Sequence, residues 1–104
     1  MSRKEKLQQM LKDTPQDSFL QHALAMEYIS EGNDTAAIAI FEAILNREPS
    51  YTGSYYQLGK LLEKKENYAA ALNWYKKGME SAGKDGDRKA YNELRSAYEE
   101  LADD

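Results

Sequence analysis

The sequence predicts an all-α fold of about six helices that pack as antiparallel pairs. The first reason is a step of 34 residues, which separates the two prolines of the chain, Pro15 and Pro49, and also relates Phe41 to Tyr75. A period of this length is typical of stacked helical hairpins. The second reason is that apolar residues follow helical spacing, and no segment shows the strict alternation of a half-buried strand.

The first three helices are predicted at 3–12, 17–31 and 34–47, between segments rich in turn-forming residues. Each carries apolar residues three and four positions apart, so that they share one face. These rows are Leu7, Met10 and Leu11, then Leu20, Leu24 and Tyr28, then Ala37, Ile38, Phe41, Ile44 and Leu45. Asp17 and Asp34 stand where a helix needs an N-cap acceptor. Pro49 is expected to end the third helix and to set the angle into the next.

The last three helices are predicted at 52–65, 68–82 and 87–101, for the same reasons. Their apolar rows are Tyr55, Leu58 and Leu62, then Ala71, Leu72, Tyr75 and Met79, then Tyr91, Leu94, Tyr98 and Leu101. Asn67 and Asp87 are the expected N-caps. The segment Gly83–Asp87 is predicted to be a loop, because it combines glycine, lysine and aspartate.

Two segments carry similar residues at equivalent positions, which we call columns of the repeat. The pattern resembles that of the tetratricopeptide repeat family. Segment 18–49 supplies Leu24, Ala25, Tyr28, Ala37, Phe41 and Pro49, and segment 52–83 supplies Tyr55, Leu58, Gly59, Leu62, Ala71, Tyr75 and Gly78. The resemblance implies a right-handed superhelix of antiparallel helix pairs, an α-solenoid, in which Ala25 and Gly59 are small because two helices cross closely there. The sequence departs from the family pattern at Gln21, where a large aromatic is preferred, and at Gly83, where a second proline is expected.

The two ends extend the repeat pattern, and residues 1–104 are expected to form a single domain. Residues 1–15 resemble the second half of a repeat, because their apolar residues and Pro15 precede matching ones in 18–49 by 34. Residues 87–102 resemble a C-terminal cap helix, whose apolar row follows that of segment 52–83 by 36. Arg95 stands in the column where a following helix would need a small residue. On this interpretation the chain is a two-repeat unit with a cap at each end.

Composition excludes several classes of function. The formal net charge is −4, so the clustered basic footprint of nucleic-acid binding is missing. There is no cysteine for a disulfide or thiolate metal site, and no apolar run approaches the roughly 20 residues of a membrane span. The N-terminal residues do not read as a signal peptide, so we expect a cytoplasmic protein that does not bind membranes.

No set of residues predicts catalysis, a cofactor or a metal site. His22 is the one histidine of the chain, and no serine or cysteine nucleophile accompanies it in the sequence. Asp85-Gly86-Asp87 lacks the ligand spacing and closing glutamate of a calcium loop. We predict instead that it forms a turn and an N-cap. We therefore expect a protein that is not an enzyme.

The resemblance implies a concave surface formed by the first helix of each pair. Its candidate binding residues are Phe19, His22, Met26, Ile29, Tyr56, Lys60, Glu63, Lys89 and Asn92. Aromatic, methionine and basic side chains on one surface are typical of peptide-binding hot spots. The alternative is that Phe19 and Ile29 only pad the contact with neighbouring helices. Some family members bind carboxylates through a lysine and asparagine clamp, which is not recognisable here because His22, Met26 and Gln57 occupy its positions.

Two functions follow from these features. The first is a protein-interaction module, in which a peptide or helical segment of a partner docks in the concave groove, with Lys60 and Lys89 favouring an acidic feature. The alternative is a self-associating structural subunit, in which Trp74, Tyr51 or Tyr68 is buried against a second copy as a homodimer. The sequence does not identify the partner.

Overall fold

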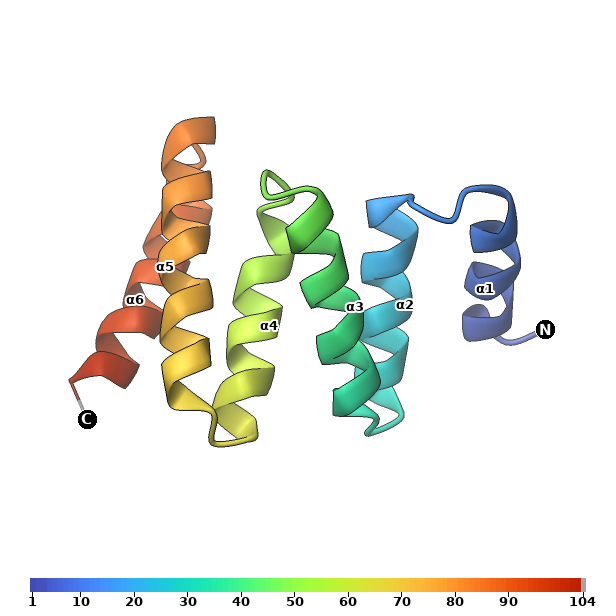
Figure 1. Cartoon of the computed structure of the whole chain (residues 1–104), viewed down its shortest axis with the longest axis horizontal. Coiled ribbons are helices and arrows are strands. Elements are labelled where there is room, and N and C mark those ends of the chain that lie inside the picture. The colour runs from blue at the N-terminus through green and yellow to red at the C-terminus, as the bar shows by residue number, and fades with distance from the viewer. Residues whose placement is uncertain (104) are drawn as a thin grey trace.

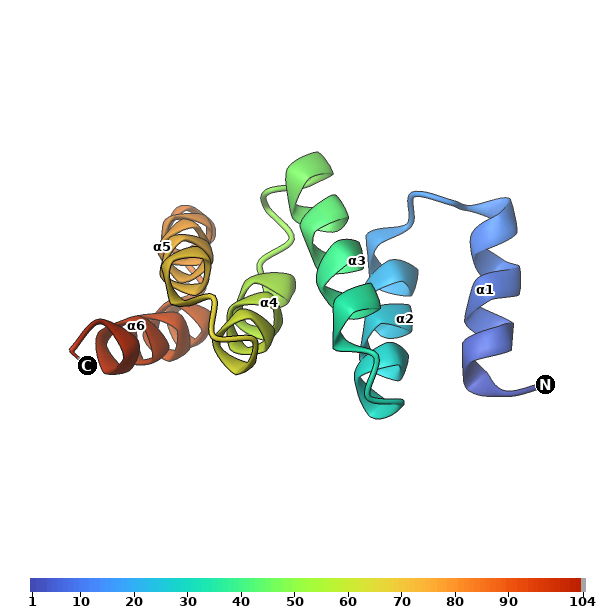
Figure 2. The ribbon, with the colours of Figure 1, turned by 60° about the horizontal axis from the view of Figure 1, so that its bottom comes forward.

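The computed structural model describes residues 1–103, and in this part of the chain it contains six helices and no strand. The helices are α1 (Arg3–Asp13), α2 (Ser18–Ser30), α3 (Asp34–Arg47), α4 (Gly53–Lys64), α5 (Tyr68–Asp85) and α6 (Arg88–Ala102). Consecutive helices run antiparallel and stand side by side in chain order (Figure 1). α5 lies over the space between α4 and α6, and contacts both (Figure 2). The all-α solenoid predicted from the sequence is confirmed.

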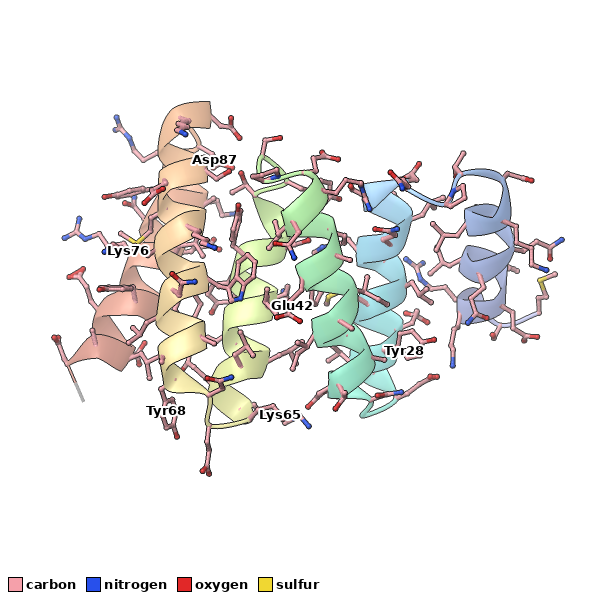
Figure 3. The ribbon with its side chains drawn as sticks, in the orientation of Figure 1. Tyr28, Glu42, Lys65, Tyr68, Lys76 and Asp87 are labelled. Carbon is pink, nitrogen blue, oxygen red and sulfur yellow. The ribbon has the colours of Figure 1, made fainter. Side chains whose placement is uncertain are left out.

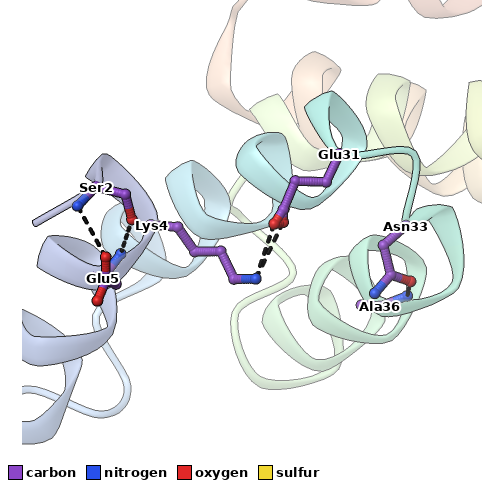
Figure 4. A network of polar contacts seen from close by, with 6 residues as sticks. All are labelled: Ser2, Lys4, Glu5, Glu31, Asn33 and Ala36. Carbon is purple, nitrogen blue, oxygen red and sulfur yellow. Dashed lines mark hydrogen bonds and ion pairs between the residues drawn. The ribbon is translucent and has the colours of Figure 1, made fainter.

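Side-chain caps fix where most of the helices begin. Ser2 and Glu5 form a reciprocal capping box at α1, with both hydrogen bonds at 3.1 Å (Figure 4). Asp17, Asn67 and Asp87 cap α2, α5 and α6, as predicted. The predicted cap of α3 is wrong: the Asn33 side chain accepts from the Ala36 amide at 3.2 Å, and Asp34 is the first helical residue (Figure 4).

The predicted end of α5 is also wrong, since the helix continues through Gly83, Lys84 and Asp85 instead of entering a loop. It ends at Gly86, whose φ of 70° lies in the left-handed region that glycine adopts most easily. The amide of Asp87 then donates to the carbonyl of Ala82 at 2.9 Å, which closes the last turn. The shift of the repeat spacing from 34 to 36 therefore lengthens α5, and only Gly86 and Asp87 connect it to α6.

The core lies between the two helices of each pair. Its fully buried residues include Ala25, Ala37, Phe41, Ile44, Leu58, Ala71 and Tyr75. A Cβ atom on Gly59 would overlap the ring of Tyr75, so the expectation that α4 needs a small residue there is confirmed. The tyrosines of the predicted core differ, because Tyr55 and Tyr75 are buried whereas Tyr28, Tyr91 and Tyr98 are half-buried.

Polar contacts close the upper end of each helix pair in the view of Figure 1. In the first pair, the Ser18 hydroxyl donates to Glu48 at 2.8 Å and accepts from Arg47 at 2.9 Å. In the second pair, Thr52 stands 34 residues after Ser18, and its hydroxyl lies 3.0 Å from that of Ser81. Equivalent residues at the starts of α2 and α4 therefore contact the end of the second helix of their pair. Among residues 1–103, no helix combines the length and apolar character that crossing a bilayer requires.

Candidate functional site

The nine residues that the sequence singled out lie on α2, α4 and α6, and we call this set the α2–α4–α6 face. Its members are Phe19, His22, Met26, Ile29, Tyr56, Lys60, Glu63, Lys89 and Asn92. The two large apolar side chains that stand out are Phe19, which is 70% exposed, and Met26, which is 36% exposed. Asp17 caps α2 and so places Phe19 in its first turn, and Met26 follows on the same side two turns later.

His22 lies between Phe19 and Met26 in the sequence, but its ring turns inward and is half-buried. It meets the ring of Phe41 edge-on at 5.2 Å between centroids, and the ring of Tyr51 at 5.9 Å. His22 Nδ1 lies 2.8 Å from the hydroxyl oxygen of Ser54, a hydrogen bond that joins α2 to α4. Burial lowers the pKa of His22, which favours the neutral imidazole.

The His22–Ser54 pair has the distance of a base and a nucleophile, and the sequence had not indicated it. Ser54 is fully buried, so its hydroxyl cannot reach a substrate, and the pair acts as a structural contact. One signal was available in the sequence: Ser54 stands 34 residues after Leu20, so a serine replaces an apolar residue in a column of the repeat. A polar residue in such a column needs a hydrogen-bond partner.

Three members of the face come together around Tyr75. The Tyr75 hydroxyl donates to the Glu63 carboxylate, and burial together with this hydrogen bond raises the pKa of Tyr75. Lys60 Nζ lies 3.6 Å from Glu63 Oε2 and 5.7 Å from the centre of the Tyr56 ring. The Glu63 carboxylate therefore compensates much of the Lys60 charge. The sequence did not reveal this, because Tyr75 belongs to the buried column of the second repeat.

The remaining members of the face differ in exposure. Ile29 is half-buried and packs against the core. Lys89 and Asn92 are exposed on α6, and Lys89 has no ion-pair partner among residues 1–103. The face is thus apolar along α2, neutral at its centre on α4, and polar along α6.

The residues predicted for self-association differ in exposure. Tyr51 is half-buried beside His22, Trp74 is half-buried on α5, and Tyr68 is 49% exposed at the start of α5 (Figure 3). In the part of the chain that the structure describes, no three histidine, cysteine or acidic side chains are grouped to hold a metal ion.

Comparison with known proteins places the chain among helical repeats. The family model for the tetratricopeptide repeat matches residues 20–51 and 52–85. A tetratricopeptide repeat domain protein from Salinibacter ruber is 36% identical, with a TM-score of 0.79 over 83% of this chain and 96% of that chain. A protein from Bordetella parapertussis is 26% identical, with a TM-score of 0.81 over 98% of this chain and 89% of that chain.

A more distant likeness concerns the TPR2B domain of yeast Sti1, whose solved structure is a complex with pHsp70. The TM-score is 0.86 over 96% of this chain and 80% of that chain, and the sequences are 16% identical, so the likeness concerns the fold alone. No curated protein sequence matches the chain significantly.

Proposed function

This chain belongs to the tetratricopeptide repeat family, and from that premise we propose that it is a cytoplasmic, non-enzymatic protein-interaction module. Repeats of this family generally mediate contacts between proteins, and solenoids offer extended surfaces for such contacts. The proposed ligand is a peptide or helical segment of a partner protein, and its proposed site is the α2–α4–α6 face.

The observation that carries the proposal is the exposure of Phe19 and Met26 on one side of α2. Neither residue belongs to the core cluster, and both side chains are large and apolar. Complete burial of such a side chain contributes on the order of 1.5–3 kcal/mol. Phe19 is 70% exposed and can contribute most of this on binding, whereas Met26 is 36% exposed and contributes about a third of it. Phenylalanine and methionine are also enriched in the buried centres of protein interfaces.

The polar part of the face suggests which feature of the ligand is recognised. Lys60 is compensated by Glu63, so it attracts an acidic group less than its exposure suggests. Lys89 on α6 is exposed and has no ion-pair partner among residues 1–103, so it is the cation of the face that favours an acidic group. The proposed ligand therefore places apolar side chains on α2 and an acidic side chain near α6.

The Sti1 TPR2B domain supports a protein ligand at the level of the fold, because its solved structure includes pHsp70. It does not identify the partner of this chain. The homodimer stays a second prediction, which light scattering after size exclusion tests directly: a monomer whose mass does not change with concentration would contradict it.

The experiment is a selection of displayed peptides on the native protein, followed by affinity measurements with Phe19→Ala and Met26→Asp. We expect each substitution to weaken the selected peptide about tenfold or more, because hot-spot residues typically cost over 1.4 kcal/mol. Met10→Asp is the matched control, since Met10 is 46% exposed on α1 and lies outside the α2–α4–α6 face. If folded Phe19→Ala, Met26→Asp and Met10→Asp all bind the selected peptide with equal affinity, the proposed site is contradicted.

A further inference from the structure

A recess lies between α3 and α5, outside the α2–α4–α6 face, and we call it the Trp74 groove. It encloses about 480 Å³. Its lining includes the apolar Leu45 and Pro49, the aromatic Tyr55 and Trp74, and the lysines Lys77 and Lys84 beside the acidic Glu80 and Asp85. They come from the end of α3, the turn that follows it, the first turn of α4 and one side of α5. Figure 1 shows this side of the molecule, with α3 and α5 flanking α4.

The groove has a rigid aromatic floor. The rings of Tyr55 and Trp74 lie 6.1 Å apart between centroids and are tilted by 45°. The Tyr55 hydroxyl donates to the carbonyl of Pro49 at 2.6 Å, which ties the floor to the turn after α3. Tyr55 is buried, whereas Trp74 is only half-buried and keeps part of its indole open to a ligand. Such a preformed aromatic recess binds a planar apolar side chain with little reorganisation.

Two lysines border this floor on α5. Lys77 Nζ lies 4.8 Å from the centre of the Trp74 ring, and Lys84 follows two helical turns later, about 10 Å along the axis. Neither lysine has an ion-pair partner among residues 1–103. Glu80 and Asp85 also line the groove, and Asp85 accepts a hydrogen bond from the Thr52 hydroxyl at 3.3 Å.

The first repeat provides an internal comparison, because its residues stand 34 positions earlier in the same architecture. Trp74, Lys77 and Lys84 correspond there to Ile40, Ala43 and Ser50. The scaffold therefore does not require an indole or two ammonium groups at these positions. The extra length of α5 also brings Lys84 into the last turn of the helix, whereas α3 ends before the corresponding position. Aromatic and basic character is thus specific to the second repeat.

We propose that the Trp74 groove binds an acidic segment of another protein that carries an aromatic side chain. The aromatic ring packs against the open part of Trp74, beside the Lys77 ammonium that lies over the indole, and carboxylates on either side of it meet Lys77 and Lys84. This site is separate from the one under the proposed function. A nucleic-acid strand fits less well, because Glu80 and Asp85 line the groove beside the two lysines, so the groove lacks the basic cluster that a row of phosphates requires.

Trp74 is the one tryptophan of the chain, so its fluorescence reports on this groove alone. The probe is the blocked peptide Glu-Glu-Phe-Glu-Glu, and the controls are Glu-Glu-Ala-Glu-Glu, Lys-Lys-Phe-Lys-Lys and oligothymidylate. We expect a saturable change of Trp74 emission with the probe, and binding at least about tenfold weaker with each control. No saturable change at millimolar peptide, or equal binding of the lysine peptide, would overturn the proposal, and so would preferential binding of oligothymidylate.

Charge-reversal variants locate the binding. Lys77→Glu with Lys84→Glu is expected to weaken the acidic aromatic peptide at least about tenfold. The matched control is Lys65→Glu with Lys76→Glu, which changes the net charge equally at exposed lysines: Lys65 lies at the lower end of α4, and Lys76 on the side of α5 away from α3 (Figure 3). Equal loss in both double variants would indicate a non-specific charge effect and overturn the proposal. If Trp74 emission shifts with protein concentration in the absence of peptide, a second copy of the chain occupies the groove. That result would also overturn the proposal.

Discussion

Gly59 on α4 lies directly against the ring of Tyr75 on α5, with no room between them for a methyl group. The ring can occupy this place because α4 has no side chain there, and its hydroxyl then reaches Glu63 on the same helix. The close crossing of α4 and α5 therefore positions Glu63, and through it Lys60, on the α2–α4–α6 face. The position of the surface residues Glu63 and Lys60 therefore depends on a glycine in the core.

Replacing Gly59 by alanine is expected to lower the free energy of unfolding by about 1–3 kcal/mol, because the new methyl group overlaps the Tyr75 ring. Gly83→Ala is the matched control, since Gly83 is also helical but faces open space. That substitution should raise the free energy of unfolding by about 0.5–1 kcal/mol. Urea unfolding followed by circular dichroism measures both, and a neutral Gly59→Ala would show that the helices do not cross this closely.

The ion pair between Asp34 and Lys64 is expected to stabilise the contact between the two repeats. Lys64 Nζ lies 2.9 Å from Asp34 Oδ2, and the Asp34 side chain is only 9% exposed. The other oxygen, Oδ1, has no hydrogen-bond partner within residues 1–103. Lys64→Ala should therefore cost about 1 kcal/mol, a modest value because the lysine itself is 68% exposed to solvent.

Lys65→Ala serves as the control for this pair, because Lys65 is the exposed neighbour of Lys64. Its stability should stay within about 0.5 kcal/mol of the native protein. The difference between the two variants should shrink in concentrated salt, which screens the exposed ammonium. Equal midpoints of urea unfolding at low salt would contradict the role given to Lys64.

His22 should make stability depend on pH below neutrality. Its pKa is lowered by burial, so the unfolded chain takes up a proton near pH 6.5 while the folded chain stays neutral. The unfolded state then binds more protons, and stability falls as pH decreases from 6.5 toward the folded pKa. His22→Asn keeps an acceptor for Ser54 and removes this titration. Unfolding midpoints between pH 7.5 and 5.5 should fall more steeply for the native protein, and parallel curves would contradict the prediction.

Much of the fold could be predicted from the sequence, because the repeat columns encode burial. Ala37, Phe41, Leu58 and Tyr75 are fully buried as their columns require. One error occurred where a contact between helix pairs affects the start of a helix. Asn33 caps α3 instead of Asp34, because Asp34 instead pairs with Lys64 from the next helix hairpin, a contact that local sequence does not encode.

The candidate site was less predictable. Helical spacing indicates on which side of a helix a residue lies, but not which residues its side chain contacts. His22 shares its column with Tyr56, yet it turns toward Phe41 and Ser54. Lys60 and Glu63 both lie in the helix predicted at 52–65, whereas the link to Tyr75 depends on the packing of α5. Phe19 required the structure to show that it is exposed and does not pad a neighbouring helix.

The most direct test of the proposed interaction module uses the methyl groups of the four methionines as reporters in NMR spectra. Met26 lies on the α2–α4–α6 face, Met1 and Met10 are exposed outside it, and Met79 is half-buried against the core. When a peptide selected on the native protein is added, we expect the Met26 methyl signal to shift with saturation while those of Met1 and Met10 stay in place. A saturable shift of Met1 or Met10 without one of Met26 would contradict the account.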